Sequence, residues 1–193
     1  NNIQQADGAN DVAFVRALLD DAEARLCIDT TRVFAAGMSN GSAFSARLAC
    51  AMPDRLTAVA FVGAFIYPAT CNSDRPMAVI GFHGTDDACV PYEGGRSQCG
   101  LMLPVPNVED AAQSWSRHNG CQTTPSLTEL TANVSVTAYS ECDDETAVVL
   151  YTIRGGGHTW PGSIDVPRLG ATTQEIDATE LIWEFFTGQA ALR

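Results

Sequence analysis

Uninterrupted apolar runs of strand length, separated by stretches of helical periodicity, constrain this fold more than any other feature of the sequence. The runs Thr57–Gly63 and Met77–Phe82 lack the polar residue at every second position that a half-exposed strand would have. Such runs are typical of parallel strands that are covered on both faces. Arg32–Gly37 and Ala147–Ile153 are predicted to be two further buried strands, and the alternating stretch Val134–Tyr139 is predicted to be a fifth strand.

Helical signals lie between and around these strands. Apolar residues recur on one helical face from Asp11 to Leu26, with Asp11 as the predicted N-cap, and small residues fill a second helical segment, Ser39–Cys50. A third apolar stripe ends at Trp115, and the capping pattern Asp177-x-x-Glu180 begins a final helix. Strands that alternate with helices predict an α/β fold with a mainly parallel sheet and helices on both faces.

The composition excludes several classes of protein. With 193 residues, 46% of them hydrophobic and 18% charged, the chain is long enough for one domain with a sizeable core and too apolar for a disordered segment. The formal net charge is −12, and all 11 basic residues are arginines. An acidic chain without a basic cluster disfavours nucleic acid or an anionic membrane as a partner. No apolar run approaches the roughly 18–20 residues of a membrane span.

Seven cysteines, at positions 27, 50, 71, 89, 99, 121 and 142, indicate a secreted or periplasmic protein with disulfides. None of them forms a C-x-x-C pair or has a histidine at zinc-ligand spacing, so no structural metal is expected. Cys121 and Cys142 flank the strand Val134–Tyr139 and are predicted to pair, and Cys89 can pair with Cys99 across a glycine turn. The odd count leaves one cysteine that is free or paired outside this chain. Buried free thiols are the alternative interpretation.

The motif Gly37-Met38-Ser39-Asn40-Gly41 has the form G-x-S-x-G and lies between a predicted strand and a predicted helix. A sharp strand-to-helix turn crowds the backbone, so small residues are needed two positions before and two positions after the serine. The turn exposes the Ser39 hydroxyl as a nucleophile. It also puts the Asn40 backbone N–H at a helix N-terminus, where an oxyanion can be stabilised. The alternative is a glycine-rich turn with an ordinary serine N-cap.

A serine nucleophile needs a general base, and the chain has three histidines. His158 follows the last predicted strand and a run of three glycines, a flexible loop that can carry its side chain across the top of the sheet to Ser39. His118 is predicted to lie at the surface near a helix end. His83 is predicted to be a turn histidine that ties its loop to nearby backbone. An acidic residue after the predicted strand Met77–Phe82 would give the order Ser, Asp, His along the chain. This is the order in hydrolases whose serine lies in such a strand-to-helix turn, the nucleophile elbow.

These motifs resemble those of the polyhydroxybutyrate depolymerase-like esterases, a family of secreted α/β-hydrolases that includes feruloyl esterases. The resemblance covers most of the chain, and its most specific part is the string GGGHTWPG at Gly155–Gly162. The other matching motifs are the Ser39 elbow followed by Arg47-Leu-Ala-Cys50, His83-Gly-Thr-Asp-Asp87 followed by Val90-Pro-Tyr92, Asn119-Gly-Cys121 and Ile176-Asp-Ala-Thr-Glu180.

The resemblance implies an α/β-hydrolase in which Ser39 is the nucleophile, His158 the base and Asp87 the acid. Asp87 is chosen because the family's acid is the fifth residue of H-G-T-x-D, and Asp86 is the alternative. The implied enzyme is a serine esterase that works through an acyl-enzyme intermediate without a cofactor. Its substrate would be a feruloyl, acetyl or hydroxyalkanoate ester, derived from the plant cell wall or from a polyester. Trp160 and Tyr92 are expected to wall the acyl pocket, and packing in the core or a loop is their alternative role.

The resemblance also predicts that residues 1–193 are the C-terminal portion of a single α/β-hydrolase catalytic domain that lacks its N-terminal strands. No strand or His-Gly oxyanion loop is recognisable before Arg32. The chain is then a piece of a cleaved enzyme, a chain without its start, or a truncated homologue completed by a partner. We expect a second polypeptide to pair with the Arg32–Gly37 strand, because a strand buried on both faces needs a neighbour on each side. The alternative function is a non-catalytic fragment or a binding domain of a split hydrolase.

Overall fold

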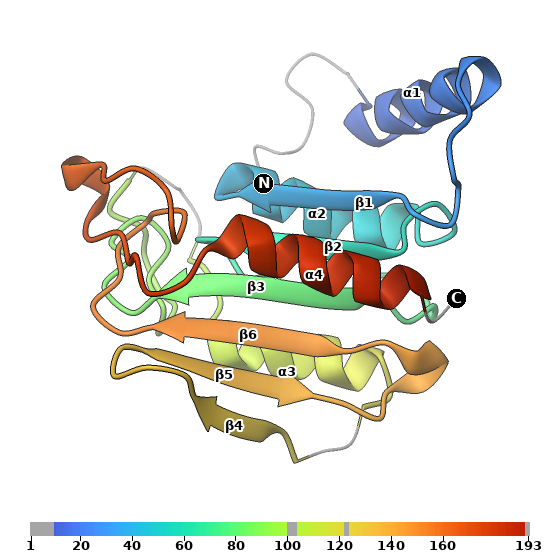
Figure 1. Cartoon of the computed structure of the whole chain (residues 1–193). Coiled ribbons are helices and arrows are strands. Elements are labelled where there is room, and N and C mark those ends of the chain that lie inside the picture. The colour runs from blue at the N-terminus through green and yellow to red at the C-terminus, as the bar shows by residue number, and fades with distance from the viewer. Residues whose placement is uncertain (1–9, 100–103, 122–123, 192–193) are drawn as a thin grey trace.

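The computed structural model describes residues 10–99, 104–121 and 124–191 of the chain (Figure 1). Helices and strands alternate along most of this length, as the sequence predicts. The elements are α1 (Asp11–Arg25), β1 (Phe34–Met38), α2 (Asn40–Ala51), β2 (Ala58–Val62), β3 (Ala78–Gly84), α3 (Val108–His118), β4 (Ser126–Glu129), β5 (Val134–Tyr139), β6 (Val148–Ile153) and α4 (Ala178–Ala191). Short 3-10 turns lie at Asp143–Glu145 and Pro167–Leu169.

The strands form one six-stranded sheet in the order β1-β2-β3-β6-β5-β4. The first four strands in this order are parallel, and β5 and β4 continue the sheet antiparallel. The predicted mainly parallel sheet is confirmed. Strand β4 was not predicted, because all four of its residues are exposed and it carries no apolar alternation.

Helices cover both faces of this sheet, as predicted (Figure 1). On one face, α2 and α3 pack over a core that includes Phe61 and Trp115, and α1 adds Val12, Val15 and Leu19 to the edge of this core. On the other face, α4 buries Ile182 and Phe186. These two layers cover both faces of β2, which explains why every residue of that strand is buried.

Helix α1 departs from the predicted pattern at both ends. The N-cap is Asn10 rather than Asp11, because the Asn10 side chain accepts the Ala13 backbone N–H at 3.1 Å. Leu26, predicted on the apolar face, follows the helix and is 64% exposed. Arg55 ties the helix to the body of the protein through Asp20 at 2.6 Å and Glu23 at 2.7 Å. Since these carboxylates are partly exposed, each ion pair contributes at most about 1 kcal/mol.

Strand β1, which leads into the serine, is an edge strand of the described sheet. Its single neighbour is β2, the one neighbour that the crossover through α2 can supply. Its residues are half-buried or exposed, whereas those of β2 are all buried. The predicted second neighbour of this strand stays a prediction.

Three disulfides link Cys50 to Cys71, Cys89 to Cys99 and Cys121 to Cys142. The two pairs that the sequence predicted are confirmed, and the unpaired seventh cysteine is the exposed Cys27. Within the described part of the chain, every helix is too short or too polar to cross a membrane.

Candidate active site

Ser39 sits in a strained turn between β1 and α2. Its φ of 57° and ψ of −116° lie outside the regions that non-glycine residues ordinarily adopt. Such a conformation costs of order 1–3 kcal/mol and is retained at functional sites. The turn brings backbone against backbone, because a Cβ at Gly37 would lie 2.2 Å from the carbonyl carbon of Gly41. The first glycine of the motif is therefore required by the close approach, as the elbow pattern predicts.

Ser42, which was not among the predicted site residues, anchors this turn to the neighbouring strand. Its buried hydroxyl donates to the Gly37 carbonyl oxygen at 2.7 Å, with the Val62 carbonyl as a second acceptor at 2.9 Å. The same oxygen accepts the backbone N–H of Val62 at 2.9 Å. The Ser39 backbone N–H also donates to Val62, at 2.8 Å. The elbow is thus held against the end of β2, and the signal for this was only a small residue three positions after Ser39.

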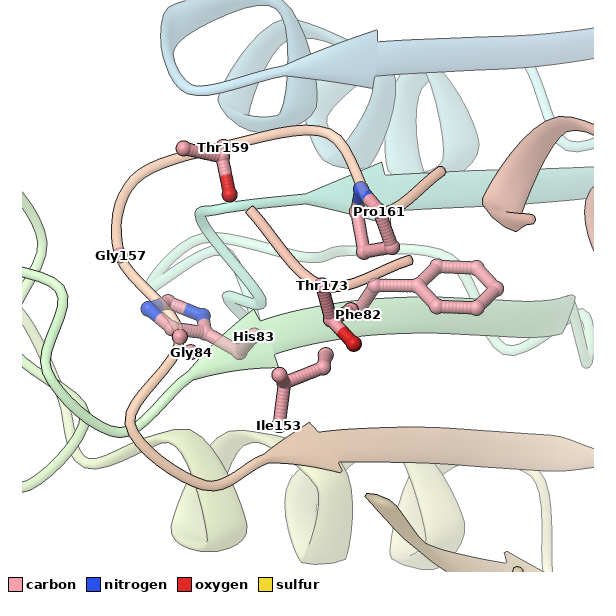
Figure 2. Close-up of a pocket in the computed structure, with 9 residues that line it drawn as sticks. Phe82, His83, Gly84, Ile153, Gly157, Thr159, Pro161 and Thr173 are labelled. Carbon is pink, nitrogen blue, oxygen red and sulfur yellow. The ribbon is translucent and has the colours of Figure 1, made fainter. Parts of the chain in front are cut away.

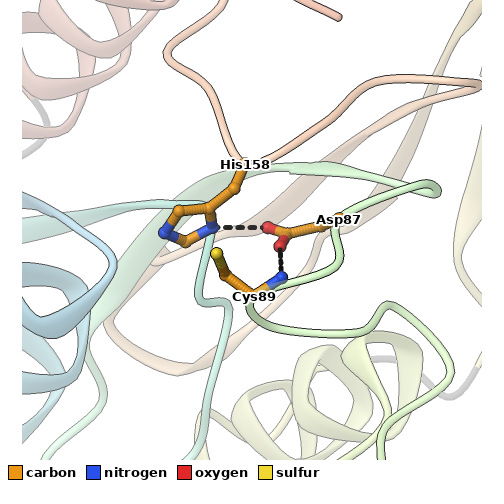
Figure 3. Close-up of side chains that lie close together, drawn as sticks. All are labelled: Asp87, Cys89 and His158. Carbon is orange, nitrogen blue, oxygen red and sulfur yellow. Dashed lines mark hydrogen bonds and ion pairs between the residues drawn. The ribbon is translucent and has the colours of Figure 1, made fainter. Parts of the chain in front are cut away.

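A buried carboxylate and imidazole meet beyond the ends of β3 and β6 (Figure 3). His158 Nδ1 and Asp87 Oδ2 are 2.7 Å apart, and the two side chains are 7% and 0% exposed. The other carboxylate oxygen, Oδ1, accepts the backbone N–H groups of Cys89 at 2.8 Å and Val90 at 2.7 Å. A carboxylate in this position accepts a hydrogen bond from Nδ1–H, which leaves the Nε2 lone pair of His158 free to act as a base.

Asp87, and not Asp86, is the acid beside His158. The Asp86 side chain is exposed and accepts a hydrogen bond from the Thr85 hydroxyl at 3.1 Å. The turn that begins at Gly84 directs Asp87 inward, and backbone N–H groups hold its carboxylate in that position.

The glycines before His158 serve close packing. A Cβ at Gly84 would lie 2.1 Å from the Gly156 carbonyl oxygen, and one at Gly157 would lie 2.3 Å from the Leu169 carbonyl oxygen. The backbone N–H of His158 donates to Leu169 at 2.7 Å. The three glycines before His158 were predicted to form a flexible loop. Gly156 and Gly157 are instead tightly packed and fix the position of His158, whereas a Cβ at Gly155 would meet no atom within 4 Å.

Ser39 and His158 are both neighbours of Gly63, the residue that follows β2. Met38 pairs with Val62 in the parallel register, so Ser39 lies beside Gly63 along the same two chains. Gly63 has a φ of +65°, and a Cβ on it would lie 3.1 Å from His158 Nδ1. The nucleophile candidate and the base candidate are therefore brought to the same end of the sheet, each beside Gly63.

The remaining predicted site residues differ in position. Asn40 is the first residue of α2 and is exposed, so its backbone N–H belongs to the helix N-terminus, where N–H groups have no partner within the helix. Trp160 is half-buried against the α4 side of the core, and its indole N–H donates to Thr179 at 3.0 Å.

Tyr92 lies in the interior instead of facing an open pocket. It is 5% exposed, and its hydroxyl bonds Thr152 at 2.8 Å and Glu109 at 3.2 Å. Burial raises the pKa of Tyr92 to about 12. This position favours the packing role that the sequence left open for this residue.

Two other features near Asp87, a group of possible metal ligands and a small hollow, do not fit a metal site or the site of the Ser39 and His158 chemistry. Donor atoms of Asp87, Cys89 and His158 lie within 4.8 Å of one another, but the Cys89 sulfur is in a disulfide and is not a thiolate ligand. A small hollow beside the end of β3 has Phe82, His83, Ile153, Pro161 and Thr173 among its lining residues (Figure 2). Neither Ser39 nor His158 lines this hollow, so it is not where their chemistry would take place.

A strained serine between a strand and a helix, with a buried acid–histidine pair at the ends of parallel strands, defines an α/β-hydrolase fold. An acetyl xylan esterase from Aspergillus awamori has a similar structure, with a TM-score of 0.58 and 14% sequence identity over 94% of this chain and 68% of that one. At this identity the likeness concerns the fold alone. No protein-family model matches the sequence.

Sequence comparison is more specific. Feruloyl esterase B from Piromyces equi is 31% identical over 157 residues, which are 78% of this chain and 29% of that protein. Feruloyl esterase C from Emericella nidulans is 30% identical over 179 residues, which are 91% of this chain and 57% of that protein. The chain is thus related to a feruloyl esterase-like family, and it spans at most about three fifths of the length of these relatives.

Proposed function

We propose that this chain carries the catalytic residues of a serine carboxylic ester hydrolase, with Ser39, His158 and Asp87 as its triad. The observation that carries the proposal is the buried 2.7 Å hydrogen bond between His158 and Asp87, at the same end of the sheet as the strained Ser39 and beside the same residue, Gly63. The names of the related feruloyl esterases support ester hydrolysis as the reaction.

The proposed reaction begins with proton transfer. The Asp87 carboxylate accepts a hydrogen bond from Nδ1–H of His158, and Nε2 takes the proton of the Ser39 hydroxyl as the oxygen attacks the ester carbonyl carbon. The resulting oxyanion accepts a hydrogen bond from the Asn40 backbone N–H. His158 then gives its proton to the leaving alcohol, and an acyl-enzyme remains. A water molecule then attacks the acyl-enzyme in the same way, with His158 as its base, and the carboxylic acid product is released. General-base catalysis contributes ~10²–10⁴-fold, and each oxyanion donor about 3–4 kcal/mol.

The proposed substrate class is an ester with a feruloyl, acetyl or hydroxyalkanoate acyl group. Feruloyl esters are favoured within this class by the two related feruloyl esterases. Trp160 is the remaining candidate for a wall of the acyl pocket, because it is two residues from His158 and half-buried. Nothing in this mechanism calls for a cofactor.

A fluorophosphonate probe tests the proposal directly, because it forms a stable bond only with an activated serine. Labelling at Ser39 that is abolished in Ser39→Ala and in His158→Ala supports a serine esterase. Ser163→Ala is the matched control, since Ser163 is exposed on the same loop as His158 and should leave labelling unchanged. If the folded, complete protein is not labelled, the chain belongs to the alternative class, a non-catalytic fragment or binding domain.

We also propose that residues 1–193 are part of one catalytic domain and that a second polypeptide strand pairs with β1. The exposed edge of β1 supports this, because unpaired backbone groups on an apolar strand invite strand addition. Phe14 and Leu18 on α1 are 67% and 54% exposed on the segment that precedes this edge. The proposed occupant is a strand from the part of the longer relatives that this chain does not match.

The mass of the native protein decides this point. Intact mass before and after reduction reveals an attached second piece, and size-exclusion chromatography with light scattering reveals one that is bound without a covalent link. A preparation of this chain that is monomeric, free of other polypeptide and fully active would contradict the proposed partner. Export to an oxidising compartment is proposed from the three disulfides, and it is checked by counting free thiols in protein isolated without reductant.

A further inference from the structure

His83 is a buried titratable group that the proposed reaction does not use. It lies near the end of β3, and its side chain is 0% exposed. Its Nδ1 accepts the Phe65 backbone N–H at 3.3 Å, and its Nε2 donates to the Val90 carbonyl oxygen at 2.8 Å. Because a backbone N–H can only donate and a carbonyl can only accept, these partners fix a neutral ring with its proton on Nε2.

The same Nε2 atom lies close to the acid of the proposed triad. His83 Nε2 lies 3.5 Å from Asp87 Oδ2, the oxygen that also accepts from His158 Nδ1 at 2.7 Å. Two imidazoles therefore flank one carboxylate oxygen. Since Nε2–H donates to Val90, the contact with Asp87 is electrostatic: the polar N–H group lies beside a carboxylate from which water is excluded, where such an interaction is strengthened.

The environment of His83 keeps it uncharged. The titratable groups that face it are Asp87, His158 and Tyr92, whose ring packs edge-on at 5.9 Å between ring centres. Burial, as the largest cause, lowers the pKa of His83, and a proton on Nδ1 would meet the Phe65 N–H head-on. A neutral His83 leaves the full charge of Asp87 to His158. A charged His83 would compete for that charge.

His83 also joins three segments of the site. Phe65 belongs to the segment that starts at Gly63 beside His158, and Val90 belongs to the loop that carries Asp87. We propose that His83 is a positioning residue, whose neutral, Nε2-protonated imidazole holds the Asp87 carboxylate in place for His158. This inference rests on the proposed triad, and it adds a residue that acts only through Asp87.

Three substitutions separate the two hydrogen bonds of the ring. His83→Gln keeps an N–H near the Nε2 position, His83→Asn keeps an acceptor near the Nδ1 position, and His83→Phe keeps the volume and neither bond. We expect kcat for a p-nitrophenyl ester to fall ~10–100-fold in His83→Phe, with KM within about twofold, because the acid loses its orientation. His83→Gln should recover most of this loss, and His83→Asn should recover little.

The pH profile separates positioning from simple loss of stability. A misplaced Asp87 stabilises the His158 imidazolium less, so the acid limb of the kcat profile should move to lower pH in His83→Phe and return in His83→Gln. Ile80→Val is the matched control, because Ile80 is buried on the same strand and packs on the α4 side. It should lower the melting temperature and leave the acid limb unmoved.

A measurement on the unaltered protein does not depend on the variants folding. Nitrogen-15 NMR of labelled histidines should find His83 neutral with its proton on Nε2 at pH 7, with a protonation midpoint below that of an ordinary histidine. A charged ring, or a proton on Nδ1, overturns the inference. The inference is also overturned if the unaltered protein is active and reacts with fluorophosphonate while His83→Phe folds and keeps the normal kcat and acid limb. If the unaltered protein is not labelled by fluorophosphonate, the proposed function fails instead, and the NMR result still decides the state of His83.

Discussion

Replacing the acid by its amide tests the geometry of the site most sharply. In Asp87→Asn, the amide can adopt two orientations, which differ in whether its oxygen or its NH₂ group faces His158. The amide oxygen can stay on the N–H groups of Cys89 and Val90, which lie 2.8 and 2.7 Å from Oδ1, or it can turn to His158. Turning would leave the buried N–H groups of Cys89 and Val90 unpaired, at about 1–3 kcal/mol each. Staying would leave only Nδ1–H of His158 without an acceptor. The amide NH₂ will therefore face His158.

That orientation changes the tautomer of His158. Facing an NH₂ donor, His158 Nδ1 must become an acceptor, so the ring proton moves to Nε2, where the base is needed. The expected loss in kcat is ~10⁴-fold, the size of effect that a wrong tautomer produces in a serine triad. Hydrolysis of p-nitrophenyl acetate measures the loss. Asp86→Asn is the control and should stay within about twofold, because Asp86 is exposed. Retention of a tenth of the normal rate in Asp87→Asn would refute this account of the site.

The remaining predictions concern backbone contacts and a crosslink. Gly37→Ala should lower kcat at least ~100-fold, because its Cβ would lie 2.2 Å from the Gly41 backbone, whereas Gly188→Ala on α4, which meets no atom within 4 Å, should leave kcat unchanged. Gly63→Ala should lower kcat even at temperatures well below the melting temperature of the variant, where it is still folded. The reason is that the new methyl group would lie 3.1 Å from His158 Nδ1, on a residue with φ of +65°. Peptide mapping without reduction should find Cys121 linked to Cys142, and Cys121→Ser with Cys142→Ser should lower the free energy of unfolding by about 3 kcal/mol in urea titrations; alkylation of both thiols in unreduced protein would contradict the linkage.

The sequence predicted the parts of the fold whose pattern is local. Strand β5 has the predicted bounds, and β2, β3 and β6 lie within two residues of theirs, because buried parallel strands are visible as apolar runs. Strand β4 left no such trace, since it is exposed and pairs only along one edge. The cap of α1 was misplaced by one residue because Asn10 and Asp11 are both good N-caps, and only the folded backbone, in which Asn10 accepts the Ala13 N–H, distinguishes them.

The candidate site was likewise predictable from the sequence only where its signals are local. Ser39 and His158 stand in motifs that are contiguous in sequence, so their positions could be predicted. The contacts that orient them could not, because they join residues far apart in the chain. Ser42 reaches Val62 across 20 residues, and His83 reaches Phe65 across 18. Tyr92 was expected to face the substrate only because it is near Asp87 in sequence, and the structure directs it inward to Thr152.

The buried state of His83 also predicts how stability depends on pH. Burial lowers the pKa of His83 in the folded protein below its ordinary value of 6.5, so below about pH 6.5 the unfolded chain binds a proton that the folded chain does not. The stabilising contribution is thus fully present above that pH and is lost as the pH falls toward the folded-state pKa. The limiting slope is about 1.4 kcal/mol per pH unit for one proton.

Other groups also titrate in this range, so the comparison must be with a variant. Urea unfolding of the unaltered protein and of His83→Gln between pH 7 and 5 isolates the single proton, because the remaining carboxylates and histidines are common to both. The free energy of unfolding should fall more steeply with decreasing pH in the unaltered protein, by up to one proton's worth of slope. Equal slopes would mean that His83 takes up its proton as readily in the folded protein as in the unfolded chain, and the buried neutral imidazole beside Asp87 would then be wrong.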